Sequence, residues 1–147
     1  MGDFDMNIRI YDYLPEEAVK IRKAVFVEEQ GFSMEFDDTD RTAAHMVLFD
    51  EDQPVGVCRF FRNESAEDYL IGRIAIVKEY RGQNLGAMLL ESAEKEIKKR
   101  GGKRTLLHAQ CRAEDFYQKQ GYSRFGEADM DENCPHIWMR KTIGENR

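Results

Sequence analysis

The sequence is poor in cysteine and proline, and it has no long hydrophobic run. Its three cysteines, Cys58, Cys111 and Cys134, have neither the even count nor the density of a disulfide framework, and no Cys-x-x-Cys pair suggests structural zinc. No window approaches the roughly 18 apolar residues of a membrane span, and the first residues lack the basic and apolar regions of a signal peptide. We therefore expect a soluble, cytoplasmic protein with reduced thiols and no membrane partner.

Positive charge is also scarce, because 22 Lys and Arg stand against 28 Asp and Glu and give a net charge of -6. Nonspecific attraction to a phosphate backbone is therefore disfavoured, and we expect no nucleic-acid partner. The 147 residues fit one domain, which we place over 1–147. The oligomeric state stays open between monomer and homodimer.

Apolar periodicity and turn residues predict the order of the elements. We expect strands over 7–11, 45–49, 55–61, 69–77, 105–109, 122–126 and 136–141. Helices are expected between Pro15 and Gly31, between Leu85 and Arg100, and over 113–119. The result is an α+β fold, a mixed and mostly antiparallel central sheet flanked by helices.

An acidic segment, 30–41, separates the first expected helix from the strands. Glu35, Asp37, Asp38 and Asp40 give it a charge that would attract a cationic amine. Such a run is more often a solvated loop, and over 30–41 we expect a loop or a short irregular helix rather than a strand.

A glycine-containing junction links the strand 69–77 to the helix that follows. It reads Arg81-Gly82-Gln83-Asn84-Leu85-Gly86-Ala87. The first N–H groups of a helix have no partner within the helix and lie at its positive end, so small residues there let a phosphate approach. The alternative is a merely tight strand-to-helix turn, because glycine pairs at this spacing also arise by chance.

Two other phosphate-binding motifs do not fit the junction. A P-loop requires Lys followed by Ser or Thr after its last glycine, whereas Ala87-Met88 follows Gly86. A dinucleotide fingerprint requires three glycines in Gly-x-Gly-x-x-Gly. Nucleotide hydrolysis is therefore disfavoured.

The segment IAIVKEYRGQNLGAMLL resembles the pyrophosphate-binding motif of the GNAT superfamily of acetyl-CoA-dependent N-acetyltransferases, Gln/Arg-x-x-Gly-x-Gly/Ala. Arg81 opens the motif and Gly86 closes it. Asn84 stands where glycine is usual, so either Asn84 adopts a left-handed conformation or the loop opens slightly. Lys78 replaces a common proline.

A second segment, AQCRAEDFYQKQGY, resembles the family pattern Asn-x-x-Ala-x-x-Phe-Tyr-x-x-x-Gly-Phe, with Gln110 in place of Asn. VFVEEQGF and CPHIWMRK resemble the ElaA/YjcF-like branch, so the resemblance covers nearly the whole chain. It implies a splay between the fourth and fifth strands, and acetyl-CoA as the acetyl donor.

The resemblance also assigns roles to individual residues. Main-chain groups of Ile74, Ala75 and Ile76, together with Gln110, would contact the pantetheine arm. Tyr117 would protonate the departing CoA thiolate, since a phenol of reference pKa near ~10 is close enough to a thiol at ~8.5 for proton sharing. Phe116 would pack beside it at the cofactor.

The acceptor side is less well marked. The amine must lose a proton before it attacks, and Glu28, Glu29 and His136 are the candidate bases. The first two also fit a solvated helix end, and His136 fits a hydrogen-bonded strand residue. Cys134 and His136 have no second pair at ligand spacing, so we expect no metal.

The sequence thus predicts an acetyl-CoA-dependent N-acetyltransferase acting on a primary amine of a small molecule or peptide by direct attack. A noncatalytic acyl-CoA-binding module stays the alternative.

Overall fold

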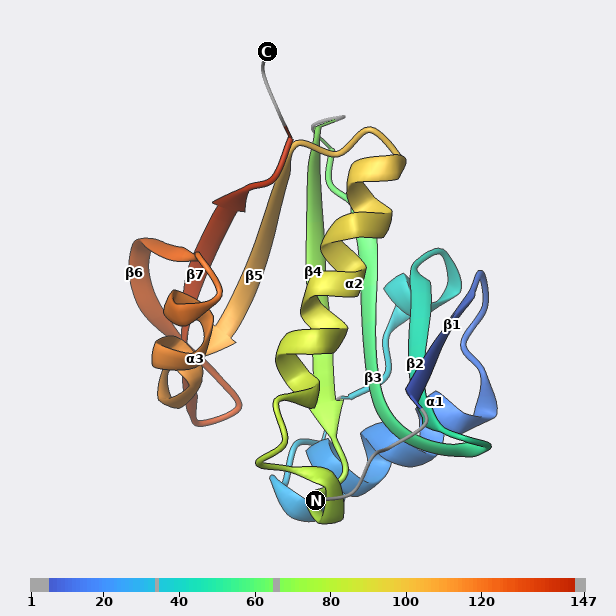
Figure 1. The fold of residues 1–147 in the computed structure, drawn as a ribbon. Helices are drawn as coiled ribbons and strands as arrows, with labels where there is room; N and C mark the ends of the chain where they lie inside the picture. The colour runs from blue at the N-terminus through green and yellow to red at the C-terminus, as the bar shows by residue number, and fades with distance from the viewer. Residues whose placement is uncertain (1–5, 34, 65–66, 145–147) are drawn as a thin grey trace. The chain divides into compact units, whose positions relative to one another are not determined.

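The computed structural model describes residues 6–33, 35–64 and 67–144 (Figure 1). The chain divides into two compact units. The first unit comprises residues 1–61 and 73–93, and the second comprises residues 62–72 and 94–147. The division falls within strand β4 (Asp68–Ile76) and within helix α2 (Leu85–Lys99), so each unit holds part of both elements. The single domain over 1–147 stays a prediction.

The strands follow the sheet order β1-β2-β3-β4-β5-β7-β6. Strands β1 and β2, β2 and β3, β5 and β7, and β6 and β7 pair antiparallel, whereas β4 and β5 pair parallel. The predicted mixed, mostly antiparallel sheet is therefore confirmed. The remaining strands are β1 (Met6–Tyr11), β2 (Ala44–Asp50), β3 (Gln53–Arg62), β5 (Arg104–Gln110), β6 (Ser123–Asp131) and β7 (Cys134–Thr142).

The parallel ladder between β4 and β5 is short. It joins Asp68–Leu70 to Arg104–Leu106, although β4 continues to Ile76 and β5 to Gln110. The two strands make no further pairs within the described residues. This early end of the ladder is the predicted splay between the fourth and fifth strands.

The first helical segment changes its hydrogen bonding part-way along. Helix α1 (Glu16–Arg22) begins after Pro15, and a π-helical segment, η1 (Lys23–Glu29), continues it. The N–H of Gln30 donates to the carbonyl of Val25 at 3.0 Å, five residues back. The prediction of one α-helix is therefore wrong after Arg22, because apolar spacing does not distinguish a π turn from an α turn. Such turns are frequent at functional sites.

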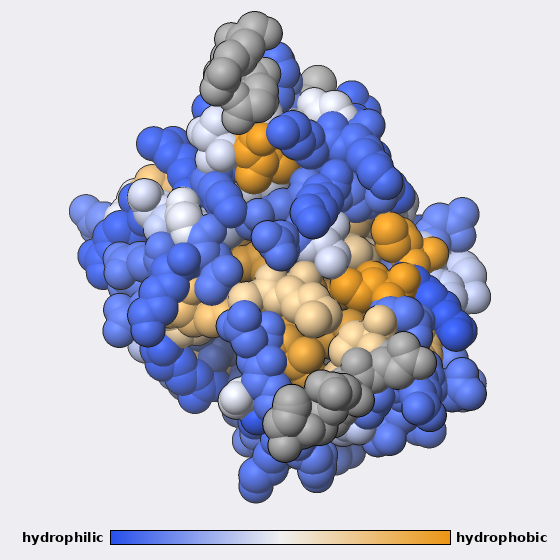
Figure 2. Space-filling model, viewed as in Figure 1, coloured by the Kyte–Doolittle hydropathy of each residue, from blue (hydrophilic) through white to orange (hydrophobic). Residues whose placement is uncertain are grey.

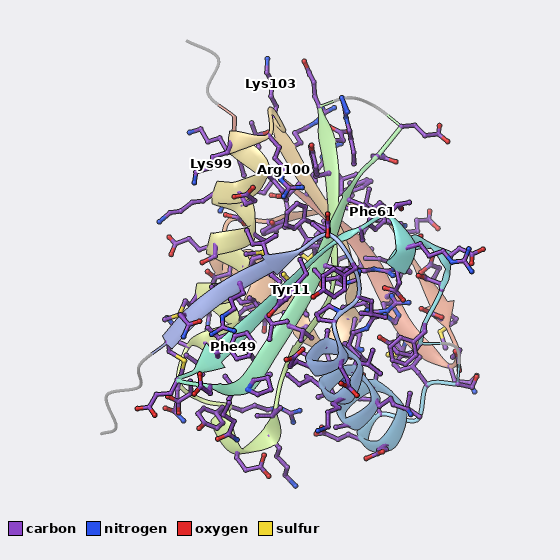
Figure 3. The ribbon with its side chains drawn as sticks, turned by 90° about the vertical axis from the view of Figure 1, so that its right-hand side faces the viewer. Tyr11, Phe49, Phe61, Lys99, Arg100 and Lys103 are labelled. Carbon is purple, nitrogen blue, oxygen red and sulfur yellow. The ribbon has the colours of Figure 1, made fainter. Side chains whose placement is uncertain are left out.

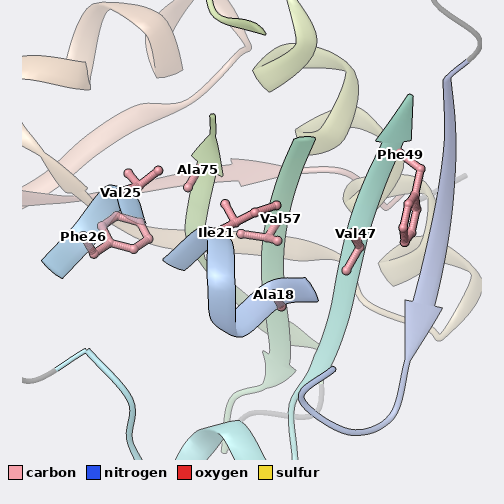
Figure 4. Close-up of a cluster of buried hydrophobic side chains, with 8 residues drawn as sticks. All are labelled: Ala18, Ile21, Val25, Phe26, Val47, Phe49, Val57 and Ala75. Atoms are coloured by element: carbon pink, nitrogen blue, oxygen red, sulfur yellow. The ribbon is translucent and has the colours of Figure 1, made fainter. Parts of the chain in front are cut away.

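The hydrophobic core of the first unit lies between this helical segment and the sheet (Figure 4). The predicted apolar stripe is confirmed, because each of its members is at most 8% exposed. Burying a side chain of this size contributes about 1.5–3 kcal/mol. The stripe is Ala18, Ile21, Val25 and Phe26, and it packs on Val47, Phe49, Val57 and Ala75.

Within the acidic segment 30–41, residues 38–41 form the short irregular helix that the sequence allowed, but Glu35 and Asp40 are buried rather than solvated. Arg22 is 1% exposed and donates through Nε to Glu35 Oε2 at 2.7 Å and through Nη1 to Asp40 Oδ1 at 2.8 Å. Asp40 lies in a short 3-10 helix, η2 (Asp38–Arg41), and both carboxylates are 5% exposed. These two acidic side chains thus serve as counter-ions to a buried arginine, which sequence periodicity could not reveal.

Two further arginines complete this buried ion cluster, which we define as Arg22, Glu35, Asp37, Asp40, Arg59 and Arg73. Arg59 Nη1 donates to Asp37 Oδ1 at 2.6 Å and to Asp40 Oδ1 at 2.8 Å. Arg73 Nε lies 3.0 Å from Glu35 Oε2. Burial alone would raise the pKa of Asp40, but the hydrogen bond and charge of Arg22 lower it to about 2. For Glu35 burial outweighs its arginines, so its pKa is raised.

The second unit contains the other short helices and the C-terminal strands. A 3-10 turn, η4 (Cys111–Ala113), leads into α3 (Glu114–Lys119). Strands β6 and β7 are longer than predicted, and β7 begins at Cys134 rather than at His136. The predicted strand 122–126 began one residue early, because Tyr122 precedes β6. A tight turn, Glu132–Asn133 with positive φ at both residues, closes this hairpin.

A buried polar network supports the second unit. The Tyr122 hydroxyl donates to Glu94 Oε2 at 2.8 Å and lies 2.7 Å from Thr105 Oγ1. Lys141 Nζ donates to Glu94 Oε1 at 2.8 Å. Burial, and then the charge of Glu94, raise the pKa of Tyr122. Its phenol is therefore a fixed hydrogen-bonding group rather than a titrating one.

The predicted end of α2 is confirmed. Lys99, Arg100 and Lys103 lie at this end of the helix (Figure 3). Gly102 follows with its backbone against Ile97 and the ring of Tyr69, which leave no room for a Cβ. A glycine is therefore required for the close approach.

Charged and polar residues cover most of the face drawn in Figure 2, with hydrophobic residues in smaller patches. Within the described residues, no helix is long and apolar enough to cross a membrane. All three cysteines are free, and Cys58 on β3 is buried, which raises its thiol pKa to about 12.

Candidate active site

The glycine junction lies in the first unit, between the 3-10 turn η3 (Lys78–Tyr80) and α2. Gly82 has φ 83° and Asn84 has φ 65°, so both occupy the left-handed region. Glycine enters this region freely, and asparagine is one of the few other residues that enter it at low cost. Of the two possibilities expected for Asn84, the left-handed conformation is the one observed.

The junction presents main-chain donors at the start of α2. Residues 81–84 are exposed, and the N–H of Met88 donates to the carbonyl of Asn84 at 3.2 Å. The N–H groups of Leu85, Gly86 and Ala87 precede that bond and have no acceptor within the helix. Together with the positive end of the helix dipole, these donors suit a phosphate group.

Arg81 is already engaged with a carboxylate. Its Nη1 and Nη2 donate to the two carboxylate oxygens of Glu29 at 2.6 and 2.8 Å, and its Nε donates to the carbonyl of Ile76 at 2.9 Å. The hydrogen bonds that Arg81 donates to Glu29 raise the pKa of Arg81. Glu29 is therefore not a purely solvated helix end. A phosphate that pairs with Arg81 must share this guanidinium with Glu29 or displace it.

A depression of about 360 Å³ adjoins this ion pair. Glu28, Glu29 and Glu79 supply its carboxylates, and Val25 and Val77 supply apolar walls. Lys78 also lines the depression, but the three carboxylates outnumber this one cation, and together with the apolar walls they suit an alkyl ammonium group. Glu28, a candidate base, is thus placed at an open cavity of the first unit.

The end of β4 carries the main-chain groups predicted to contact pantetheine, Ile74, Ala75 and Ile76. Just before them, Arg73 has φ 53°, which is unusual for a non-glycine residue within a strand. The Arg73 guanidinium donates to the carbonyl of Glu35 at 3.1 and 2.9 Å, so the buried ion cluster fixes this residue. Strained backbone of this kind clusters at functional sites, and no pattern in the sequence predicts it.

In the second unit, Gln110, Phe116 and Tyr117 lie at the end of β5 and in α3. The Gln110 Oε1 accepts from Arg112 Nε at 2.8 Å. Tyr117 is half-buried, and its ring meets those of Phe116 and Tyr122 edge to face at centroid distances of 5.0 and 6.0 Å. The three aromatic rings position one another.

His136 is 5% exposed, and its Nδ1 lies 2.8 Å from the carbonyl oxygen of Cys134. The sequence allowed His136 to be either a candidate base or a hydrogen-bonded strand residue, and the structure shows the hydrogen-bonded strand residue. Its ring stacks on His108 at 4.7 Å, and His108 stacks on Trp138 at 4.7 Å. The sequence placed His108 on a strand without a role, because its neighbours here come from other strands.

The predicted site residues thus fall into two groups. The first unit brings together Glu29, Arg81 and Ile76 by direct hydrogen bonds, with Glu28 at the adjoining depression. The second unit holds Gln110, Phe116, Tyr117 and His136. The assigned cofactor and substrate roles stay predictions for both groups.

A family model of the acetyltransferase (GNAT) domain matches residues 11–143. The chain belongs to the GNAT acetyltransferase family. This GNAT chain is 36% identical over 135 residues to YyaT of Bacillus subtilis (strain 168), which covers 88% of the chain and 90% of YyaT. It is 30% identical over 129 residues to the uncharacterized N-acetyltransferase YjcF of the same organism, which covers 86% of the chain and 91% of YjcF.

Solved structures share the fold. The crystal structure of a proposed N-acetyltransferase from Lactobacillus plantarum has a TM-score of 0.86 and 29% identity, and covers 94% of this chain and 98% of that one. The crystal structure of Escherichia coli ElaA has a TM-score of 0.83 and 24% identity, and the match covers 92% of this chain and 99% of ElaA. The predicted N-acetyltransferase and the resemblance to the ElaA/YjcF-like branch are confirmed. Nothing in these comparisons favours a noncatalytic module.

Proposed function

We propose that this GNAT chain transfers the acetyl group of acetyl-CoA to a primary amine of a small molecule or peptide by direct attack. The observation that carries the proposal is the left-handed conformation of Gly82 and Asn84 ahead of α2. It gives the exposed junction the backbone form that a pyrophosphate cradle needs, although Asn stands at a glycine position. Gln83 adds side-chain donors beside it.

The proton movements are divided between two groups. The amine, once deprotonated, attacks the thioester carbonyl, and the tetrahedral intermediate collapses with release of the CoA thiolate. Tyr117 donates its phenolic proton to that thiolate. We assign base catalysis to Glu28 rather than to Glu29 or His136. Glu29 is held by Arg81, and His136 is 5% exposed, whereas Glu28 lines the open depression.

Calorimetric titration with acetyl-CoA, CoA and ATP tests the cradle. We expect both CoA forms to bind and ATP not to bind, because ATP lacks the pantetheine arm. Binding should survive Asn84→Gly, since glycine adopts positive φ freely. Asn84→Val should weaken it about 5- to 30-fold, because a β-branched residue costs about 1–2 kcal/mol in that region. Gly86→Asp should abolish binding by placing a carboxylate against the pyrophosphate.

Release of free thiol on a panel of primary amines then tests transfer. Amine-dependent release supports the transferase. Tight CoA binding without release on any amine would leave a cofactor-binding module instead. Equal affinities for wild type, Asn84→Val and Gly86→Asp would remove the junction from the site.

A further inference from the structure

One face of the second unit gathers metal-ligating side chains from three strands. His108 comes from β5, His136 from β7 and Asp131 from the end of β6. Each offers one ligand atom, and these atoms all lie within 4.8 Å of one another. The sequence argument against a metal considered only neighbours along the chain, whereas the sheet assembles this group from residues 28 positions apart.

Hydrogen bonds already orient both imidazole rings. A carbonyl oxygen can only accept, so His136 donates its Nδ1 proton to Cys134 and carries its lone pair on Nε2. The carboxylate of Asp129 lies 2.8 Å from Nε2 of His108. Metal-binding histidines characteristically have one ring nitrogen held by a carbonyl or a carboxylate in this manner.

The geometry needs only a small contraction. Ligand atoms 2.0–2.1 Å from a tetrahedral zinc ion lie about 3.3 Å apart, so the widest separation between these atoms must close by at most about 1.5 Å. Asp131 is exposed and adjoins the Glu132–Asn133 turn, so its carboxylate can move while the stacked imidazoles stay in place.

We propose that His108, His136 and Asp131 bind a divalent transition-metal ion, Zn²⁺ foremost, with water completing the coordination. Two imidazoles and one carboxylate suit zinc and its neighbours rather than Mg²⁺ or Ca²⁺, which prefer all-oxygen ligands. The ion ties β6 to β5 and β7. A metal-bound His136 is not a base, which agrees with the assignment of base catalysis to Glu28.

Zinc titration of the chelator-treated, untagged full chain, without acetyl-CoA, tests the site. We expect one Zn²⁺ per chain and a thermal transition that rises with zinc concentration. Asp131→Asn, an exposed change that should leave the fold intact, is expected to weaken binding about tenfold or more. Asp129→Asn should cost about 10- to 100-fold through the orientation of His108. His108→Asn should remove the site.

Two matched variants serve as controls. Asp115→Asn changes an exposed carboxylate of α3 and should bind zinc as wild type does. Cys134→Ser tests whether the nearby thiol, rather than the proposed ligands, binds the ion. This variant too should bind zinc with the affinity of wild type. With Co²⁺ as probe, a thiolate charge-transfer band would assign the ion to cysteine and overturn the proposal.

Absence of stoichiometric binding to wild type would also overturn it, as would equal affinity in wild type, Asp131→Asn and His108→Asn. Because the readout is metal binding and not turnover, these outcomes leave the proposed acetyl transfer untouched. Failure of the transferase would equally leave the metal site standing.

Discussion

The neighbouring side chains of Tyr117 and Tyr122 lie in different environments. Tyr122 is 2% exposed and its hydroxyl is held by Glu94 and Thr105, whereas Tyr117 is half-buried. Their ring centroids are 6.0 Å apart. The raised pKa of Tyr122 makes its phenol a poor proton donor at neutral pH, and Tyr117 is the tyrosine that we propose as the general acid.

Replacing either phenol by phenylalanine separates catalysis from stability. We expect Tyr117→Phe to lower kcat about 10²-fold or more with little change in acetyl-CoA affinity, because only the proton donor is lost. Steady-state thiol release and calorimetry measure the two quantities. Unchanged kcat would return Tyr117 to a packing role.

Tyr122→Phe is the matched control. It leaves the buried Glu94 and Thr105 without their shared partner, which we expect to lower the free energy of unfolding by about 1–3 kcal/mol. Its kcat below the unfolding temperature should stay close to that of wild type. A turnover loss as large as that of Tyr117→Phe would contradict the division of roles.

Among the elements, the buried ion cluster ties segment 30–41 to α1, β3 and β4. Arg22 is its centre, with Glu35 on one side and Asp40 on the other. Removing one member of a buried charge network leaves the remaining charges buried without a partner. The resulting loss of stability is larger than the stability that the intact network adds relative to apolar side chains of similar size.

Arg22→Ala should therefore lower the free energy of unfolding by about 3–5 kcal/mol, measured by denaturant titration. Arg124→Ala offers a matched control, because Arg124 makes a bidentate pair with Glu114 at the surface. It should leave stability nearly unchanged, since exposed pairs are screened. Similar losses in both variants would show that burial does not govern these pairs.

The elements also show what sequence could and could not reveal. For the junction, Asn84 narrowed the sequence prediction to two forms, a left-handed Asn84 or a slightly opened loop, and the first is observed. The order of the strands along the chain and the amphipathic helix followed from local patterns. The ion cluster could not be predicted in this way. Glu35 and Asp40 stand in a polar segment that is typical of an exposed loop, and the arginines that bind them lie on other elements. The π turn after Arg22 and the position of His108 beside Asp131 likewise depend on tertiary structure.

At the scale of the whole molecule, the two units offer separate reporters of unfolding. The ion cluster lies in the first unit, whereas the single tryptophan, Trp138, lies on β7 in the second. Fluorescence therefore reports the second unit, and circular dichroism reports both. Coincident transitions would mean that the units unfold cooperatively.

We expect stability to fall as the pH is lowered from about 4 to 2. The pKa of Asp40 is about 2 in the folded chain, against its usual 3.8. Its contribution is thus fully present above pH 4 and is lost as the pH falls, on the order of 1–2 kcal/mol after screening. Glu35 acts oppositely, because its raised pKa favours the folded state at low pH and that contribution is lost as pH rises above 4.5.

Denaturant titrations at several pH values measure this dependence. Asp40→Asn should flatten the slope between pH 4 and 2 while lowering stability at neutral pH. A slope that persists in Asp40→Asn would place the responsible carboxylate elsewhere.

The burial of Cys58 has a practical consequence for enzymology on this chain. A disulfide reagent that counts liberated CoA also counts accessible protein thiols, and only the partly exposed Cys111 and Cys134 react in the native state. The blank should thus show a finite offset of at most two equivalents, with the third appearing on denaturation. A growing blank would signal unfolding during the assay, so the reagent itself monitors whether the enzyme is still folded.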